Sequence, residues 1–459
     1  MTALWTSADI AAATGGIASE AFAVQGVAFD SREVGLGDLF IALKGETTDG
    51  HRFVEGAYAS GAAGAIVSQP VTGPHVLVAD TTAALDSIGI ASRARTGARI
   101  AGVTGSVGKT GCKEALAAAL TRANRGEVHR SVKSYNNQTG VPLSLARMPS
   151  DSAFAVFEMG MNHAGEISAL TKMVRPRVAM ITAIASAHIE HLGSMEAIAD
   201  AKAEVFEGLM PGGTAIIPFD TPYRDRLLHA AAAAGVTNVV TFGRGEGADA
   251  RPMDVIESAN GTQILATLPE AELSFTLAQP GAHWVSNAMG VLAAVQAMGG
   301  DLAAAGLALG EMEGLAGRGA QHSITTSDGG RATLIDESYN ANPASMAATL
   351  LVLAATPAKR RIAVLGEMRE LGAESDALHA GLAIPVKQAG VEIALLIGPG
   401  MAPLTDALAG QCETIHVANA EAALATLSKI LRDGDTILIK GSNAVGLGLI
   451  ASSLVSGNS

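Results

Sequence analysis

The sequence predicts an α/β protein of three domains, and three observations lead to that class. Short apolar runs alternate with helical stretches along most of the 459 residues. One strand-to-helix junction carries a glycine-rich loop at residues 102–110, and a second series of alternating runs follows residue 318. Alternating strands and helices are typical of parallel sheets covered by helices. A chain of this length exceeds what one hydrophobic core usually organises, so several domains are expected.

The central domain is expected over residues 96–317. It opens with a strand-like run at 99–103, followed by the glycine loop and a helix-like run at 113–122. Further strand-like runs lie at 154–157, 178–182, 215–218 and 239–242. Residues 254–277 differ, because two strand-like runs flank Asn260-Gly261, and this pattern predicts an inserted β-hairpin.

Smaller α/β domains are expected on either side of the central one. Residues 1–95 mix short apolar runs with turns, and residues 318–459 again alternate strands with helical segments. The strands predicted for the last domain are 333–336, 361–365, 393–397, 414–417 and 436–439. That alternation is typical of a Rossmann-like layer.

Composition and charge exclude several classes of protein. The chain is 48% hydrophobic and carries 31 basic against 44 acidic residues, a net charge of −13. Such a surface repels nucleic acid and anionic membranes, so any phosphate-bearing ligand needs a local, specific site. Two cysteines, Cys112 and Cys412, are too few for a disulfide framework or a zinc knuckle.

Neither a signal peptide nor a membrane span is expected. Residues 1–15 lack a basic segment followed by an apolar core. The longest uncharged candidate for a span, residues 340–358, contains Asn342 and Pro343 and is too polar. We therefore expect a cytoplasmic protein without stable membrane insertion.

The strongest motif is the loop Gly102-Val103-Thr104-Gly105-Ser106-Val107-Gly108-Lys109-Thr110. It stands after an apolar strand and before a helix, where backbone N–H groups can converge on phosphate oxygens. Lys109 can reach the outer phosphates, and the Thr110 hydroxyl can ligate Mg²⁺. The spacing departs from the common phosphate loop, because Val103 stands where that pattern has glycine. The alternative is a glycine-rich turn with a chance Lys-Thr pair.

Residues after two other strands are candidate metal ligands. Glu158 ends the apolar run 154–157, and carboxylates at strand ends suit divalent metals. His188 and His191 follow the next apolar run, but no third soft ligand for zinc is evident. Each has an ordinary alternative: a solvated acid for Glu158, and capping or packing for the histidines.

Two residues on helix-like segments are ambiguous from chemistry alone. Lys202 lies in Ala201-Lys202-Ala203-Glu204, where a solvated lysine is the default. Asn287 lies on a largely apolar segment, where an asparagine bonded to neighbouring backbone is equally plausible.

Taken together, these motifs resemble those of the Mur ligase family, which builds the peptide stem of the peptidoglycan precursor. The loop at 104–110 resembles the family's phosphate loop, and Asn136-Asn137-Gln138-Thr139-Gly140-Val141-Pro142 resembles its Asn-Asn-x-x-Gly-x-Pro segment. The resemblance covers nearly the whole chain. It implies an ADP-forming ligase that joins an acid to an amine and uses ATP and Mg²⁺.

The resemblance also implies residue roles. The implied catalytic residues are Lys109, Glu158, His188 and Lys202, the last as a carbamylated lysine. The implied metal ligands are Thr110, Glu158, His188 and Lys202. The implied nucleotide contacts are Thr104, Gly105, Ser106, Val107, Gly108, Lys109, Thr110, Gly111, Asn287, Arg318 and Asp336. The implied substrate contacts are Ser31, Arg32, Lys44, Asp49, Asn136, Asn137, Tyr339, Asn340 and Asn342.

Segments 30–32, 37–40 and 44–46 resemble the UDP-binding domain shared by the two later ligases of the family. Segments 336–345 and 365–372 resemble in particular the branch that adds D-alanyl-D-alanine to UDP-N-acetylmuramoyl-tripeptide. That branch implies a UDP-binding first domain, an acyl-phosphate intermediate and a monomer that acts in cell-wall biogenesis, and hence in cell shape and division. Two alternatives stay open: the tripeptide-forming relative, which uses a single amino acid, and a catalytically silent ATP-binding homologue. The second is motivated by Gly111 and Asn443, where the family often has Thr and Arg.

Overall fold

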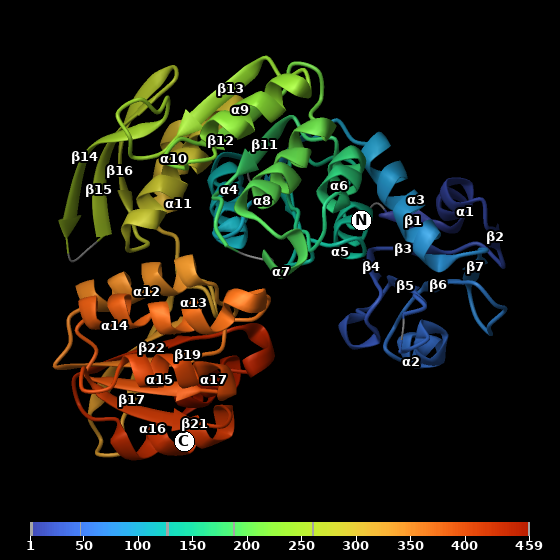
Figure 1. Cartoon of the computed structure of the whole chain (residues 1–459). Helices are drawn as coiled ribbons and strands as arrows, with labels where there is room; N and C mark the ends of the chain where they lie inside the picture. Colours follow the sequence, from blue (N-terminus) through green and yellow to red (C-terminus); the bar gives the residue numbers. More distant parts are fainter. Residues whose placement is uncertain (1–2, 46, 125–127, 187–188, 259–260, 458–459) are drawn as a thin grey trace.

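The computed structural model describes residues 3–45, 47–124, 128–186, 189–258 and 261–457. These residues form three sheets of five or six strands, a three-stranded sheet and a two-stranded one. Figure 1 shows the large sheets as three units along the chain, the first in blue, the second in green and the third in orange and red. The α/β class with three units is confirmed. We propose domain boundaries between these units, near residues 95 and 317.

The central sheet is parallel throughout. Its strands are, in spatial order, β13 (Asn238–Phe242), β12 (Thr214–Pro218), β11 (Val178–Ile181), β8 (Arg99–Thr104), β10 (Phe154–Glu158) and β9 (Val128–Arg130). All residues of β10 and β11 are buried, as are all of β8 except Arg99. Strands covered on both faces read as continuous apolar runs, which is why the sequence located them.

Two helical layers cover the central sheet. On one face lie α4 (Lys109–Asn124), α10 (Ala282–Ala297) and α11 (Leu302–Gly310). On the other lie α6 (Glu166–Val174), α8 (Met195–Ala203) and α9 (Arg224–Ala233). Successive residues of a strand face opposite layers, so Val103 of β8 packs beneath α4 whereas Ile100 packs on the other side.

The inserted segment is an antiparallel sheet of three strands, β14 (Arg251–Ser258), β15 (Gly261–Leu268) and β16 (Ala271–Leu277). The predicted hairpin was therefore wrong in its number of strands. A turn after β15 separates β16, which the sequence analysis merged with the second run. β16 packs on α11, where Phe275 and Leu273 lie against Gly306.

The C-terminal sheet is mixed. Its order is β17 (Ala320–Thr325), β18 (Arg331–Glu337), β22 (Asp435–Lys440), β19 (Arg360–Gly366), β20 (Ile393–Ile397) and β21 (Glu413–Val417). Only β17, an edge strand that the sequence did not reveal, runs antiparallel to its neighbour. One face packs on α12 (Pro343–Ala355), α13 (Ser375–Gly381), α14 (Ala383–Gln388) and α15 (Ala402–Ala407). The other packs on α16 (Ala420–Ile430) and α17 (Gly448–Ser456).

The N-terminal sheet has short strands in the order β2 (Ile17–Ala18), β7 (His75–Leu77), β6 (Gly64–Val67), β5 (Asp38–Ile41) and β4 (Gly26–Ala28). Its last four strands are parallel, and β2 pairs antiparallel with β7. A separate pair joins β1 (Trp5–Thr6) to β3 (Ala23–Val24). The flanking helices are α1 (Ser7–Thr14), α2 (Val54–Ala59) and α3 (Thr81–Ala94).

The first two units share one core at their junction. Leu143 and Ala146 of α5 (Gly140–Ala146) are buried in the same cluster as the side chains of α3. The Trp5 indole N–H donates to the Ala146 carbonyl at 2.8 Å, and the Arg147 Nε donates to the Val27 carbonyl at 2.5 Å. These contacts fix the N-terminal unit on the central one.

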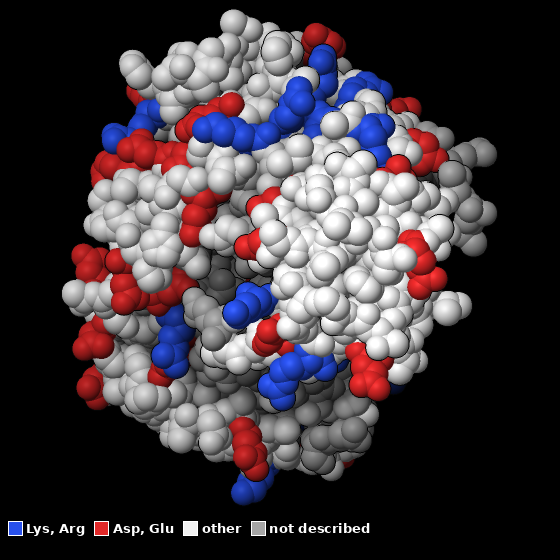
Figure 2. All heavy atoms as spheres, turned by 90° about the vertical axis from the view of Figure 1, so that its right-hand side faces the viewer, with Lys and Arg blue, Asp and Glu red and all other residues white. Residues whose placement is uncertain are grey.

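Figure 2 views the molecule with the N-terminal unit toward the reader. Acidic and basic side chains are both present around the margin of this face, a broad area without charge covers its near part, and a hollow opens beside it. Within the described part of the chain, every helix is too short or too polar to span a bilayer.

Candidate functional site

The glycine loop is fixed between β8 and α4 by contacts with the segment that follows β11. Gly105 has φ +148° and Gly108 has φ +83°, values that side chains rarely allow. A Cβ at Gly105 would lie 1.9 Å from Thr182 Oγ1. The Thr182 hydroxyl donates to the Val107 carbonyl at 2.5 Å, and the Ser106 hydroxyl donates to the Ala185 carbonyl at 2.8 Å. Both glycines are therefore required by the tight loop.

Lys109 begins α4, and its side chain folds back over the loop. Its Nζ donates to the Gly105 carbonyl at 2.8 Å. Burial lowers the pKa of Lys109, the nearby Glu158 carboxylate raises it, and the Arg318 guanidinium lowers it again. An anion placed at the loop would add a counter-charge and favour the ammonium form.

Glu158 lies beside Thr110 at the carboxyl end of β10. The Thr110 hydroxyl donates to Glu158 Oε2 at 2.7 Å, and the Asn136 amide donates to Oε1 at 2.7 Å. The carboxylate is only 1% exposed. A hydroxyl and a carboxylate in contact next to a phosphate loop are the hard oxygen donors that Mg²⁺ prefers.

Lys202 lies on α8 with its side chain buried, although the default prediction was a solvated lysine. It lines the same cavity as Lys109. Burial moves the pKa of Lys202 well below its usual value, and the positive charge of Lys109 moves it further in the same direction. An amine in this environment favours the neutral form.

His188 lies outside the described residues. α7 (Ile189–Leu192) begins directly after it, and the ring of His191 on α7 lies 5.1 Å from that of His163, centroid to centroid. Across the described ranges there is no group of three or more His, Cys, Asp or Glu side chains with metal-site geometry.

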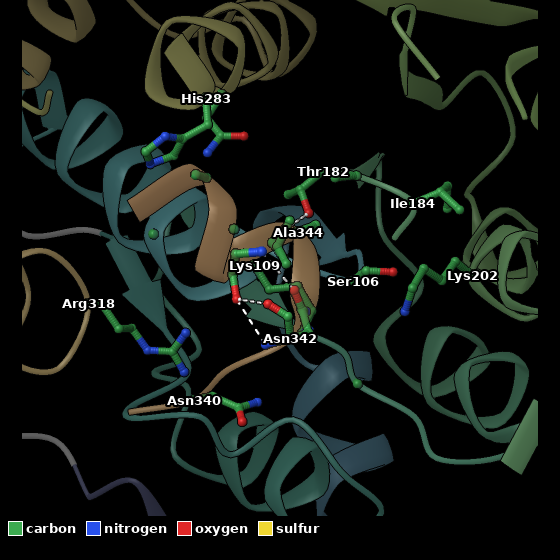
Figure 3. Close-up of a pocket in the computed structure, with 18 of the residues that line it drawn as sticks. Ser106, Lys109, Thr182, Ile184, Lys202, His283, Arg318, Asn340, Asn342 and Ala344 are labelled. Carbon is green, nitrogen blue, oxygen red and sulfur yellow. Dashed lines mark hydrogen bonds between the residues drawn. The ribbon is translucent and has the colours of Figure 1, made fainter. Parts of the chain in front are cut away.

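The C-terminal unit faces the loop across the cavity. Figure 3 shows Lys109 near the centre of the cavity with Arg318 and Lys202 on either side of it, and Asn340 and Asn342 of the C-terminal unit beside them. The Arg318 Nη2 donates to Ser134 Oγ at 2.9 Å, and its guanidinium lies 3.9 Å from the centre of the Tyr339 ring. Arg318 thus links the two units at the edge of the cavity.

Asn342 and Asn340 line the cavity and also accept hydrogen bonds from nearby backbone N–H groups. Asn342 caps α12, accepting from the Ser345 N–H at 2.9 Å. The Asn340 side chain accepts from the Ala341 N–H at 2.9 Å. Both line the cavity together with Tyr339.

Asp336 holds the backbone around Arg318. Its carboxylate accepts from the Gly317 N–H at 2.8 Å and from the Ser338 hydroxyl at 2.6 Å. It is buried and is not among the residues that line the cavity. Its neighbour Glu337, which the sequence analysis did not select, does line it.

Lys440 is a second residue that the sequence analysis did not select. It ends β22, is 2% exposed and lines the cavity. Its Nζ donates to the Asn340 carbonyl at 2.9 Å and to Glu337 Oε2 at 3.2 Å. A lysine at the end of a buried parallel strand is the signal that could have identified it.

Asn136, Asn137 and Asn287 also line the cavity. Asn137 also accepts from the Gly140 N–H at 2.9 Å, which starts α5. Asn287 on α10 lies over Gly108, because a Cβ added at that glycine would be 3.2 Å from Asn287 Nδ2.

The four candidates of the N-terminal unit are separate from this cavity. They follow the carboxyl ends of β4 and β5, Ser31 and Arg32 after β4, and Lys44 and Asp49 after β5. The Arg32 guanidinium pairs with Asp30 at 2.6 Å. Asp49 Oδ1 lies 2.6 Å from His51 Nδ1 and accepts from the His51 N–H at 3.0 Å. Ligands of open α/β sheets bind at this end of the strands.

The cavity between the central and C-terminal units has a volume of about 690 Å³. That volume is within the range of small-molecule sites. Its wall carries the phosphate-loop lysine, a buried carboxylate and two further cations, Arg318 and Lys440. The arrangement can bind a polyphosphate together with a second, polar ligand.

Comparisons with known proteins agree with this geometry. Family models match at residues 23–97 (Mur ligase family, catalytic domain), 103–295 (Mur ligase middle domain) and 317–443 (Mur ligase, glutamate ligase domain). The UDP-N-acetylmuramoyl-tripeptide–D-alanyl-D-alanine ligase of Synechocystis sp. is 36% identical, over 96% of this chain and 94% of that protein. The enzyme of the same name from Escherichia coli is 33% identical, over 92% and 91%.

Solved structures match nearly the whole chain. The crystal structure of MurF from Acinetobacter baumannii has a TM-score of 0.84 at 29% identity, covering 98% of this chain and 99% of that one. MurF ligase from Thermotoga maritima, solved in complex with ADP, shares the fold with a TM-score of 0.76 at 23% identity, covering 94% and 97%. The chain belongs to the Mur ligase family.

Proposed function

We propose that this protein is an ATP-dependent ligase that joins D-alanyl-D-alanine to UDP-N-acetylmuramoyl-tripeptide during peptidoglycan precursor synthesis. The observation that carries this function is the full-length match: relatives that bear this activity in their names align over more than 90% of both chains. The match therefore includes the N-terminal and C-terminal units, where the members of a ligase family would differ in substrate.

The phosphate loop and its surroundings are assigned to ATP. Backbone N–H groups at 104–111 would surround the β- and γ-phosphates, with Lys109 as the cation next to them. Asn287 would contact the nucleotide from α10, and Arg318 would contact it from the C-terminal side. Asp336 acts through the backbone of Gly317 in this assignment, since its carboxylate bonds to that N–H.

Mg²⁺ is assigned to the oxygen donors beside the loop. Thr110 and Glu158 fit one ion, because their oxygens are already in contact. His188 and a carbamylated Lys202 are proposed for a second. When bound, the metal ions would offset the negative charge of the phosphates.

The reaction needs positioning and charge stabilisation rather than a protein nucleophile. The γ-phosphoryl group passes from ATP to the terminal carboxylate of the tripeptide, which gives ADP and an acyl phosphate. The amine of the dipeptide then attacks the acyl carbon, and inorganic phosphate leaves with formation of the amide. Lys109 and Arg318 would stabilise the negative charge that is transferred, in a partly enclosed cavity where such interactions are strong.

The two substrates are assigned to opposite ends of the site. Ser31, Arg32, Lys44 and Asp49 are proposed to hold the UDP group at the carboxyl ends of β4 and β5. Asn136 and Asn137 are proposed for the peptide end of the same substrate. Tyr339, Asn340 and Asn342 are proposed for the dipeptide, on the C-terminal wall of the cavity.

The substitution Lys109→Ala tests this function. It should abolish the ADP formation that depends on UDP-tripeptide and dipeptide, because the transferred charge loses its nearest cation. Lys429→Ala, at an exposed position on α16, is the matched control and should leave turnover unchanged. Near-normal turnover by the Lys109 variant would contradict the assignment of the loop.

A further inference from the structure

Gly111, in the first turn of α4, lies directly against the indole ring of Trp284. A Cβ added at Gly111 would be 2.9 Å from Trp284 Cη2 and 3.1 Å from Cζ2. Trp284 is 8% exposed and belongs to the cluster that joins α4, α10 and the central sheet. A ring held in such a core cannot move aside as the end of a flexible side chain can. The indole therefore occupies the space that a side chain at residue 111 would need.

The same turn of α10 makes a second contact with the phosphate loop. Asn287, three residues after Trp284 and hence on the same side of the helix, lies over Gly108. α10 thus meets the loop and the start of α4 at two glycines. Gly108, Gly111, Trp284 and Asn287 all line the cavity.

We propose that Trp284 is a positioning residue for the nucleotide. Its indole packs on Gly111 and fixes the first turn of α4, which begins with Lys109 and Thr110. Through α10 it also fixes Asn287 against Gly108. This inference rests on the proposed function, because it takes ATP as the ligand of the loop.

The pairing gives a physical reason for glycine at residue 111. Glycine is a poor helix former, and its presence next to Lys109 and Thr110 motivated the catalytically silent alternative. Contact with Trp284 explains the glycine without a loss of function, because the indole supplies the packing that a larger residue would give.

The test is a double-mutant cycle with Gly111→Ala and Trp284→Phe. Affinity for MgATP is measured by titration calorimetry, with steady-state KM values for ATP and for D-alanyl-D-alanine. Gly111→Ala should weaken MgATP binding on the order of tenfold, since the added methyl displaces the indole. The KM for D-alanyl-D-alanine should stay within about twofold, because the effect is on the nucleotide side.

The double variant distinguishes pairing from separate effects. Phenylalanine has a shorter ring system than tryptophan, so it leaves room for the methyl group. The double variant should therefore bind MgATP no more weakly than Trp284→Phe alone. Gly381→Ala is the control for a helical glycine, because nothing lies within 4 Å of its added Cβ, and it should leave all constants unchanged.

Tryptophan fluorescence is a measurement that would not change on addition of MgATP if Trp284 had a purely structural role. The chain has two tryptophans, and Trp5 is buried in the N-terminal unit. In a Trp5→Phe background, MgATP should change the emission of Trp284. If that background does not fold, the calorimetric cycle decides alone.

The experiments distinguish a failure of the proposed function from a failure of the role proposed for Trp284. Wild-type protein that neither binds MgATP nor forms ADP would overturn the proposed function itself. Wild-type protein that is active, with Gly111→Ala binding MgATP normally or with additive effects in the cycle, would overturn only the role of Trp284.

Discussion

Lys202 is the side chain whose surroundings depart most from what its sequence suggests. It is buried in the cavity wall, and both burial and Lys109 move its pKa far downward. A buried ammonium without a counter-charge is strongly unfavourable. A neutral amine, by contrast, can add to CO₂ with release of a proton and become an anionic carbamate, which would pair with Mg²⁺ and Lys109 instead of repelling them.

Replacing Lys202 tests the carbamate directly. Lys202→Ala should reduce kcat on the order of 100-fold, because a metal-orienting anion is lost. Added acetate or formate should restore part of the activity by filling the vacated space. A carbamate carbon signal after exposure to ¹³C-labelled bicarbonate should appear in wild-type protein and be absent in the variant. Full activity of the variant would contradict this role.

His129, which is not among the residues that line the cavity, gives the stability of the protein a pH dependence. It lies on β9, and its Nε2 is 2.8 Å from the Ser144 carbonyl of α5. Burial lowers the pKa of His129 to about 4 from the usual 6.5. Between pH 4 and pH 6.5 the unfolded chain binds a proton at His129 that the folded protein does not. The neutral His129 therefore contributes to the free energy of unfolding above pH 6.5, and this contribution is lost as pH falls toward 4.

The substitution His129→Gln should remove this pH dependence while it keeps a donor for the Ser144 carbonyl. Urea unfolding at pH 7 and pH 5 measures it. Between pH 7 and pH 5, the free energy of unfolding of the wild-type protein should decrease by about 2 kcal/mol more than that of the variant. Equal losses would show that another group titrates in this window.

At the scale of elements, the sequence predicted best the strands that form continuous apolar runs. β20 matches the predicted run 393–397, and β8, β10 and β11 differ from theirs by one residue at most. β17 was missed because it is an antiparallel edge strand with alternating burial and a polar composition. The strands of the N-terminal sheet have two to four residues each, too few for a periodic pattern.

The segment between α11 and β17 is the element that connects the cavity to the C-terminal unit. Gly317 and Gly319 flank Arg318 with φ values of +71° and +98°. Asp336 fixes this segment from the C-terminal sheet, whereas Arg318 reaches Ser134 on the central unit. The segment is thus suited to transmit closure of the two units to the nucleotide.

Arg318→Lys tests this connection. Lysine keeps the charge but loses the planar group that lies on Tyr339 and bonds to Ser134. We expect kcat/KM for ATP to fall on the order of tenfold or more, with a smaller decrease for Ser134→Ala, which removes only the hydrogen bond. Arg331→Lys on β18 is the control. An unchanged kcat/KM in Arg318→Lys would remove the guanidinium from this role.

For the whole molecule, the site could be predicted only in part from the sequence. The phosphate loop was evident from its glycines, and the roles of residues such as Lys202 and Asn287 came from resemblance. Glu337 and Trp284 were missed because their signal is tertiary: each is an ordinary residue until the fold brings it to the cavity. Lys440 was missed although it directly follows the predicted strand 436–439. The candidates of the N-terminal unit lie apart from that cavity, so the proposed substrate would have to span two units.

The cavity that we propose for the acceptor is built by the central and C-terminal units together. The central unit supplies the phosphate loop, whereas the C-terminal unit supplies Arg318, Tyr339 and Asn340. A single amino acid and a dipeptide differ in length, and we propose that the C-terminal wall of the cavity selects between them by the position of the amine relative to the acyl phosphate. This is where the tripeptide-forming alternative would differ.

The most direct measurement is product formation with ATP, Mg²⁺, a UDP-N-acetylmuramoyl-peptide and one acceptor at a time. With the UDP-tripeptide and D-alanyl-D-alanine, we predict one ADP and one phosphate for each UDP-pentapeptide, identified by mass. Single amino acids with the matching UDP-dipeptide should give no product. Ligation of a single amino acid in place of the dipeptide, or ATP binding without any ADP formed, would contradict the account.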